Sequence, residues 1–377
     1  MPAPTSARSP AAADFAPAAG GLLTVDLAAI EANYRHLARL AAPARVAGVV
    51  KADAYGLGAV PVTRRLIAAG CRHFFVALLS EAIELRPLMP AGAMLAVLNG
   101  LAPGSEREAA VAGIVPVLNS LAQLRAWAAL AHDLATPLPA ILQVDTGMSR
   151  LGLSPSEVDA LADDAGMRVG LDLLYVMSHL GCADEPTHPA NRAQLAVFTA
   201  AKAKLGIATA SLANSAGIFL GPDYHFDLCR PGAAVYGLDV GPAAHGIRPV
   251  IGLKARVAQI RTIPAGASIG YGYTFTATLE MRLATLSVGY ADGWPRALGN
   301  VGAAFIDGVS LPFTGRVSMD SATIDISALP KGRLAPGSLV DLIAAEQSAD
   351  DVGRLTGTIG YEILTNIGRR YARRYIG

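Results

Sequence analysis

The stretch RVAGVVK, residues 45–51, is a compact apolar run that ends in a lysine. Short runs of this kind, rich in Val and bounded by Gly or polar residues, are typical of buried parallel strands. Helical periodicity follows the run, and the same alternation then recurs along the chain. We expect strands of this type at residues 45–51, 73–77, 94–98, 114–118, 140–145, 171–178, 208–212 and 226–229.

Eight strand–helix units over roughly 200 residues predict an N-terminal (β/α)8 barrel of the TIM type rather than an open doubly wound sheet. Upstream, residues 22–26 predict a short strand, and Asp26 is expected to cap a helix over residues 27–41. Beyond residue 241 the sequence changes to short alternating segments separated by Gly, Pro and Asp. This pattern predicts a C-terminal, mainly β domain, with helices near 348–355 and 361–367.

These patterns divide the chain into three expected parts. Residues 1–20, rich in Ala, Pro and Ser, are expected to be a disordered tail. Residues 21–245 are expected to form the barrel, with strand 22–26 as a candidate for pairing with the second domain. Residues 246–377 are expected to form the mainly β domain.

Composition narrows the classes of function. The 377 residues are 52% hydrophobic and carry a net charge of +1, so we expect neither a nucleic-acid nor a membrane partner. Three cysteines without CxxC spacing argue against disulfides and zinc. Because the first residues also lack the features of a secretion signal, we expect a cytoplasmic protein. The scattered histidines suggest no metal site.

Reactive side chains follow several of the expected strands, at the barrel end where chemistry takes place. At an apolar barrel mouth, the Lys51 amine would be desolvated and could bond covalently to a carbonyl cofactor such as pyridoxal phosphate. From position alone, a surface lysine that closes a strand is equally plausible.

Other strand ends carry polar groups suited to an anionic ligand. Asn214, Ser215 and Gly232 follow the last two strands, where barrels often hold phosphate, although Asn214-Ser215 alone reads better as a helix cap. His179 and Arg230 are individually compatible with structural roles. Their convergence at one mouth favours a functional site.

Longer motifs occur in order between residues 22 and 372. They are VVKADAYG (49–56), VDTGM (144–148) with RLG (150–152), ANSA (213–216), RPG (230–232), GYG (270–272), VGYADG (288–293), GRVSMD (315–320) and YE (361–362). In these motifs the chain resembles the alanine racemases, pyridoxal-phosphate enzymes with an N-terminal barrel and a C-terminal β domain. The resemblance implies interconversion of L- and D-alanine, for peptidoglycan synthesis or alanine catabolism.

The resemblance also implies catalytic roles. Lys51 would be the Schiff-base lysine and one of two bases, and Tyr271 the second base on the opposite face of the cofactor. Racemisation requires two bases, because a lone base would mostly restore the starting enantiomer. His179 would contact Tyr271 and be linked to Arg230, which would face the pyridine nitrogen and keep it unprotonated.

Further residues are implied to bind cofactor and substrate. The cofactor-binding set would include Tyr55, Arg150, Asn214, Ser215, Gly232, Ala233 and Tyr361. The substrate-binding set would be Arg150, Tyr290, Met319 and Asp320. In the family, β-domain residues complete the active site of the partner subunit, so the resemblance implies a homodimer.

The chain departs from the family pattern at several positions. Gln143 stands where the family often has a lysine that orients the arginine here numbered Arg150, and Gln143 could still accept a hydrogen bond from it. Leu57, Trp294, Ser318 and Gly360 also differ from the common residues. These changes bear on substrate range more than on reaction type.

Four alternatives remain open at this point, of which the simplest is a structural barrel that binds no cofactor. A racemase of serine or of broader specificity would share the motifs. A decarboxylase of the same architecture would place an acid at the pyridine nitrogen, which Arg230 argues against. A non-catalytic pyridoxal-phosphate-binding protein would lack the second domain.

Overall fold

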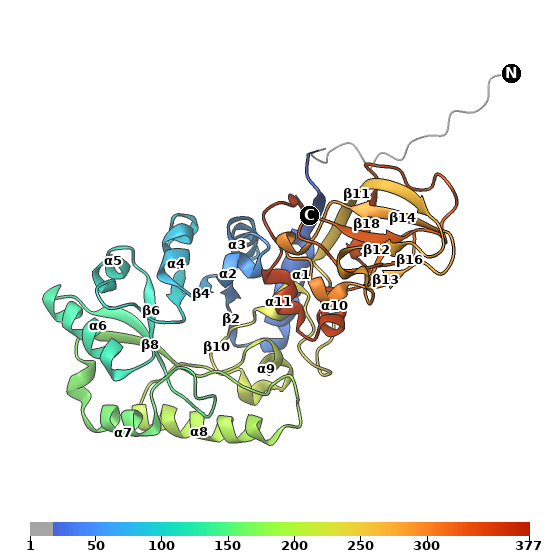
Figure 1. Ribbon diagram of the computed structural model, residues 1–377. Helices are drawn as coiled ribbons and strands as arrows, with labels where there is room; N and C mark the ends of the chain where they lie inside the picture. Colours follow the sequence, from blue (N-terminus) through green and yellow to red (C-terminus); the bar gives the residue numbers. More distant parts are fainter. Residues whose placement is uncertain (1–17) are drawn as a thin grey trace. The chain divides into compact units, whose positions relative to one another are not determined.

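The structure is a computed structural model that describes residues 18–377 (Figure 1). The expected tail falls almost wholly outside the described residues. The chain divides into two compact units. One comprises Asp26–Val250 with Gly377, and the other comprises Ile251–Ile376 with the N-terminal segment that ends at Val25.

Strands of the first unit occupy every position at which the sequence predicts a buried strand. They are β2 (Arg45–Val46), β3 (Gly48–Val49), β4 (His73–Val76), β5 (Met94–Val97), β6 (Val115–Leu118), β7 (Leu138–Gln143), β8 (Leu171–Met177), β9 (Ala210–Ser211) and β10 (Leu228–Cys229). β2 and β3 together fill the first position. β5 and β6 are buried along their whole length.

Backbone pairing closes these strands into a ring. Strands β3 to β9 form one parallel sheet in sequence order, and β2 pairs in parallel with β10. The remaining gap is bridged because Asp227 N–H donates to the Ala210 carbonyl at 3.0 Å and Arg230 N–H to the Ala213 carbonyl at 2.9 Å. The predicted (β/α)8 barrel is therefore confirmed.

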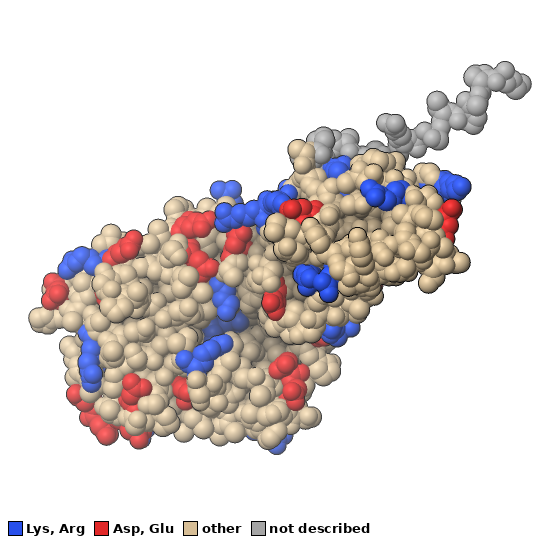
Figure 2. Space-filling view, viewed as in Figure 1, with Lys and Arg blue, Asp and Glu red and all other residues tan. Residues whose placement is uncertain are grey.

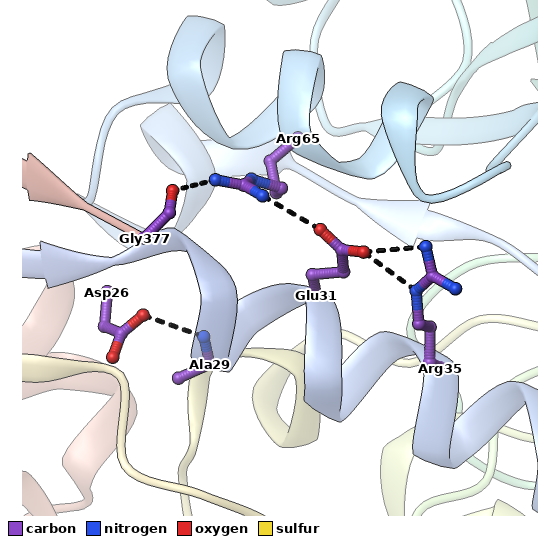
Figure 3. Close-up of polar contacts among 6 residues, drawn as sticks. All are labelled: Asp26, Ala29, Glu31, Arg35, Arg65 and Gly377. Atoms are coloured by element: carbon purple, nitrogen blue, oxygen red, sulfur yellow. Dashed lines mark hydrogen bonds and ion pairs between the residues drawn. The ribbon is translucent and has the colours of Figure 1, made fainter.

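Helices follow the strands around the barrel. They are α1 (Leu27–Ala41), α2 (Lys51–Tyr55), α3 (Ala59–Ala68), α4 (Leu79–Leu85), α5 (Glu106–Val111), α6 (Leu121–Asp133), α7 (Pro155–Asp163), α8 (Pro189–Leu205) and α9 (Ser215–Phe219). Helix α1 has the predicted bounds and buries Ile30, Tyr34 and Leu37 at helical spacing. Asp26 caps it as expected, since its carboxylate accepts from Ala29 N–H at 2.8 Å (Figure 3).

A chain of polar contacts ties α1 to α3 (Figure 3). Glu31 pairs with Arg35 one turn later at 2.7 Å and with Arg65 of α3 at 3.0 Å, and Arg65 also donates to the Gly377 carbonyl. The hydrogen bond from Arg65 is the main cause that lowers the pKa of Glu31. Exposed pairs of this kind are each worth less than about 1 kcal/mol, so the network orients the helices more than it stabilises them.

The second unit is a mainly β structure, as predicted. Its long central strand β11 (Ile251–Ile263) pairs antiparallel with β1 (Gly21–Asp26), β14 (Met281–Leu286) and β18 (Leu339–Ile343). Leu23 lies opposite Leu253 in the register with β1. The other elements are β12 (Ser268–Ile269), β13 (Phe275–Thr276), β15 (Ala303–Ile306), β16 (Val309–Pro312), β17 (Ala322–Asp325), β19 (Ala372–Ile376), α10 (Ala349–Thr356) and α11 (Gly360–Thr365).

The surface reflects the balanced charge of the sequence. Figure 2 shows blue Lys and Arg side chains interspersed with red Asp and Glu side chains on the face in view. Among residues 18–377, no helix is both long and apolar enough to cross a membrane. Within the same residues, no three His, Cys, Asp or Glu side chains are grouped to hold a metal ion.

Candidate active site

Lys51 stands at the barrel mouth, separated from β3 by Val50, as the first residue of α2. Burial is the main cause that lowers the pKa of its amine, and the nearby Arg150 guanidinium lowers it further. The carboxylate of Glu81 acts in the opposite direction. A lowered amine pKa increases the neutral, nucleophilic fraction at neutral pH.

Arg230 extends from the end of β10 into the barrel and is almost completely buried. Its guanidinium donates to the Ser178 carbonyl at 2.6 Å and to the Ser211 hydroxyl. Burial lowers the pKa of Arg230 to about 10, so the side chain remains protonated at neutral pH. These two bonds fix the direction of a buried positive charge.

His179 follows β8 and lies within electrostatic reach of three cations. Burial, and then the charges of Arg230, Arg150 and Lys51, lower the pKa of His179 to about 3. The imidazole is consequently neutral near pH 7. A neutral imidazole has one nitrogen that accepts a hydrogen bond and one that donates.

Buried hydroxyl and amide groups support this strand end. Thr146 and Ser178 share a hydrogen bond of 2.8 Å between their hydroxyls, and Ser178 also donates to the Val144 carbonyl. Gln194 of α8 donates to the Thr146 hydroxyl at 3.1 Å and to the His179 carbonyl at 2.9 Å. The network holds the backbone of His179, and sequence reasoning missed Gln194 because a glutamine inside a helix carries no distinguishing signal.

A small cradle forms where α9 meets the turn after β10. The Ser215 hydroxyl accepts from Gly232 N–H at 2.9 Å and from Ala234 N–H at 3.2 Å. The Tyr55 ring lies against Gly232, where a Cβ would overlap the Tyr55 hydroxyl and approach Cζ to 2.9 Å. Tyr55 is itself stacked on Tyr236, with 4.6 Å between ring centroids. Only glycine therefore leaves room for the cradle in this form.

Asn214 has its side chain engaged in the protein. Its amide oxygen accepts from Gly217 N–H at 2.9 Å, which caps α9, and its amide nitrogen donates to the Leu180 carbonyl at 3.3 Å. The helix cap that the sequence offered as an alternative role for Asn214-Ser215 is therefore formed by Asn214. Ser215 lies in the cradle.

Arg150 and Gln143 occupy different environments. Arg150 is exposed in the loop after β7, whereas the Gln143 side chain is buried at the strand end. Among the hydrogen bonds of residues 18–377, none joins the two side chains. The positive charge of Arg150 lowers the pKa of both Lys51 and His179.

The second unit carries the remaining expected residues, on turns. Tyr271 begins a short 3-10 turn between β12 and β13, and its side chain is 72% exposed. Tyr290 begins another such turn, whose Tyr290 and Ala291 N–H groups donate to the carbonyls of Ser318 and Met319 at 3.0 and 2.9 Å. The turns of Tyr290 and Met319 are therefore bound to each other through the backbone.

Tyr361 lies in α11 and Asp320 follows Met319 in its turn. The Asp320 carboxylate bonds to Arg370 at 2.7 Å, and Arg370 also holds the buried Asp292. Trp294 is fully buried and lies 6.1 Å from the Phe313 ring, so this departure from the family pattern is a core residue of the second unit. Asp292 and Arg370 were missed, although Asp292 lies within the VGYADG motif.

A closed barrel with a desolvated lysine, a buried protonated arginine and a hydroxyl-lined cradle at its mouth is typical of an enzyme that works through a lysine amine. Two family models match the chain: alanine racemase, N-terminal domain, over residues 25–240, and alanine racemase, C-terminal domain, over residues 250–375. The chain belongs to the alanine racemase family.

Individual relatives agree with this assignment. A catabolic alanine racemase of Mesorhizobium japonicum is 55% identical over 361 residues, covering 96% of this chain and 94% of the relative. An alanine racemase of Brucella ovis is 52% identical over 373 residues, covering 95% and 94%. Among solved structures, the alanine racemase of Bartonella henselae with covalently bound pyridoxal phosphate has a TM-score of 0.92 at 43% identity, covering 95% of this chain and 100% of that one.

Proposed function

We propose that this chain is an alanine racemase that interconverts L- and D-alanine with pyridoxal phosphate bound at the barrel mouth. The observation that carries the proposal is the desolvated amine of Lys51, placed with Arg150, His179 and Arg230 at one end of a closed barrel. The family relationship supports the same reaction.

The residues present fit the cofactor. The Ser215 hydroxyl accepts two backbone hydrogen bonds and keeps its own proton to donate to a phosphate oxygen. Ala233 is the first residue of a 3-10 turn, so its N–H has no acceptor within that turn. We assign the phosphate to Ser215, Gly232, Ala233 and Tyr55, with Asn214 positioning Ser215, and we propose Tyr361 as a further ligand.

Bound pyridoxal phosphate supplies an electron-withdrawing ring that makes the α-proton of an attached amino acid acidic. Lys51 would hold the cofactor covalently through Nζ and exchange the proton on one face. Arg230 would donate to the ring nitrogen and, being protonated, keep that nitrogen without a proton. A ring with an unprotonated nitrogen withdraws electrons less strongly than a protonated ring. We propose that this difference limits the reaction to proton exchange.

The second base in this proposal is Tyr271. Because Tyr271 and Met319 are 72% and 52% exposed, their side chains are available to a second copy of the chain. We propose a homodimer in which Tyr271, Met319 and Asp320 serve the barrel of the partner subunit. In that arrangement, the neutral imidazole of His179 in one subunit would accept a hydrogen bond from the Tyr271 hydroxyl of the other subunit. The charge of Arg230 would act on the same imidazole.

The substrate proposed is alanine, with Arg150, Tyr290, Met319 and Asp320 around it. The same residues admit serine, because a pocket distinguishes a methyl from a hydroxymethyl group by only about 1–3 kcal/mol. Relatives described simply as alanine racemase and as catabolic alanine racemase have nearly equal identity, 52% and 55%. We therefore propose the reaction without assigning it to peptidoglycan synthesis or to catabolism, and we place it in the cytoplasm, which suits the three free cysteines.

The decisive experiment incubates the protein and pyridoxal phosphate with L-alanine, and separately with L-serine, in heavy water. The expected result is that L-alanine yields deuterated product of both enantiomers. If serine exchanges as fast, the specificity is broader than proposed. Retained configuration without exchange, despite bound cofactor, would overturn the racemase assignment.

A further inference from the structure

The peptide after Lys51 adopts an unusual backbone conformation. Ala52, Asp53, Ala54 and Tyr55 have φ values of 54°, 53°, 52° and 56°, so four consecutive non-glycine residues lie in the left-handed region. L-residues disfavour this region, and it is normally visited by single residues. The turn places Lys51 and Tyr55 at its two ends, and contacts from outside must hold it.

Two carboxylates provide such contacts. Asp53 accepts from Ala59 N–H at 2.7 Å, which ties the turn to the start of α3. Glu81 of α4 accepts from Ala52 N–H at 2.6 Å through one carboxylate oxygen. The other oxygen of Glu81 accepts from the N–H groups of Ala77 and Leu78 at 2.8 and 3.0 Å. Glu81 thus joins the end of β4 to the peptide beside Lys51.

An acid at the third position of a helix commonly bonds to the N–H groups before that helix, and this explains the bonds to Ala77 and Leu78. The bond to Ala52 goes beyond a cap, because it reaches the neighbouring strand end. The negative charge of Glu81 also raises the pKa of the Lys51 amine, whereas the positive charge of Arg150 lowers it. The charge of Lys51 is also one of the causes that lower the pKa of His179, which is neutral near pH 7.

We propose that Glu81 is a positioning residue for Lys51. It holds the left-handed turn at the barrel mouth and opposes the Arg150 charge at the amine, which sets the fraction of Lys51 available for bonding to the cofactor. The role in catalysis rests on the proposed function, whereas the effect on the amine does not.

The test measures the amine directly in the full-length chain freed of cofactor. Lys51 is acetylated over a range of pH, and peptide mass spectrometry gives the midpoint of its labelling. Glu81→Gln removes the charge but keeps one acceptor oxygen, and we expect its midpoint to fall by about 0.5–1 pH unit. Glu84→Gln, at an exposed position on the same helix, is expected to leave the midpoint unchanged.

A second measurement separates positioning from charge. Glu81→Ala loses both acceptors, so we expect weaker binding of pyridoxal phosphate than Glu81→Gln shows, by about 10-fold. Wild-type midpoint and cofactor affinity in Glu81→Gln would overturn the proposal, even if Glu81→Ala fails to fold. If the wild-type chain binds no cofactor, the proposed function fails, but a shifted midpoint in Glu81→Gln still supports the link between Glu81 and Lys51.

Discussion

Arg370 donates two parallel hydrogen bonds to the buried carboxylate of Asp292, from Nε at 2.7 Å and from a terminal nitrogen at 2.8 Å. The remaining terminal nitrogen bonds to Asp320 at 2.7 Å. The bond to Asp292 is the main cause that raises the pKa of Arg370. Since Asp292 belongs to the Tyr290 turn and Asp320 to the Met319 turn, one arginine joins two segments that are proposed to contact substrate.

Removal of this link should destabilise the second unit. Arg370→Ala leaves the buried carboxylate of Asp292 with Gly289 N–H as its one remaining donor among residues 18–377. We expect the free energy of unfolding to fall by about 1–3 kcal/mol, a loss that the half exposure of Arg370 keeps small. The midpoint of urea unfolding measures this loss of stability. Arg369→Ala removes an exposed neighbouring arginine and serves as the control. Equal midpoints for the two variants would contradict the structural role.

Gly232→Ala should weaken cofactor binding. The added methyl group would overlap the Tyr55 hydroxyl, and displacing a packed group of this kind costs about 1–3 kcal/mol, or about 5–150-fold in affinity. Titration with pyridoxal phosphate followed by visible absorbance measures the affinity. In Gly252→Ala the new methyl group meets nothing closer than 3.9 Å, so that variant should bind as the wild type does. Unchanged affinity in Gly232→Ala would argue against the cradle.

The low pKa of His179 predicts how stability depends on pH. The folded pKa of about 3 lies below the ordinary value of 6.5, so below pH 6.5 the unfolded chain binds a proton that the folded chain does not. Stability should therefore fall between pH 6.5 and pH 4 by up to about 1.4 kcal/mol per pH unit, and His179→Gln should reduce that slope. Urea unfolding at both pH values tests this, with the exposed His132→Gln as control. A slope that His179→Gln leaves intact would refute the prediction.

Lys51→Ala should abolish covalent attachment of the cofactor and both directions of the reaction, because the barrel-mouth amine is lost. Borohydride reduction of the wild-type protein followed by peptide mapping identifies the attached lysine. Lys331→Ala, on the surface of the second unit, should retain full labelling and activity. Labelling of any lysine other than Lys51 would show that the assignment is wrong.

Tyr271→Phe should selectively slow α-proton exchange on the L-enantiomer's side, by about 100- to 10,000-fold, since one of two bases loses its hydroxyl. Deuterium incorporation started separately from each enantiomer measures this asymmetry. Tyr273→Phe is a closely matched control, because Tyr273 is 74% exposed in the same turn. Wild-type exchange of both enantiomers in Tyr271→Phe would remove Tyr271 from the mechanism.

Several residues of the candidate site could be located from the sequence because they stand at strand ends. Lys51, His179 and Arg230 each follow an apolar run, and parallel strands in a barrel bring their carboxyl ends to one mouth. The supporting groups could not be found in this way. Gln194 lies 48 positions from Thr146, to which it donates, and Glu81 lies 29 positions from Ala52. Neither residue belongs to a recognised motif.

The sequence by itself determined the (β/α)8 barrel, the mainly β second unit and the family, because hydrophobic periodicity and ordered motifs are properties of neighbouring residues. Only the tertiary structure decided that Glu81 holds the peptide beside Lys51, that Arg370 joins two turns, and that Asn214 caps a helix while Ser215 lines the cradle. These partnerships depend on which polar groups are left near each other once the strands and turns have packed. Burial then makes each of them bond to whatever donor or acceptor lies within reach.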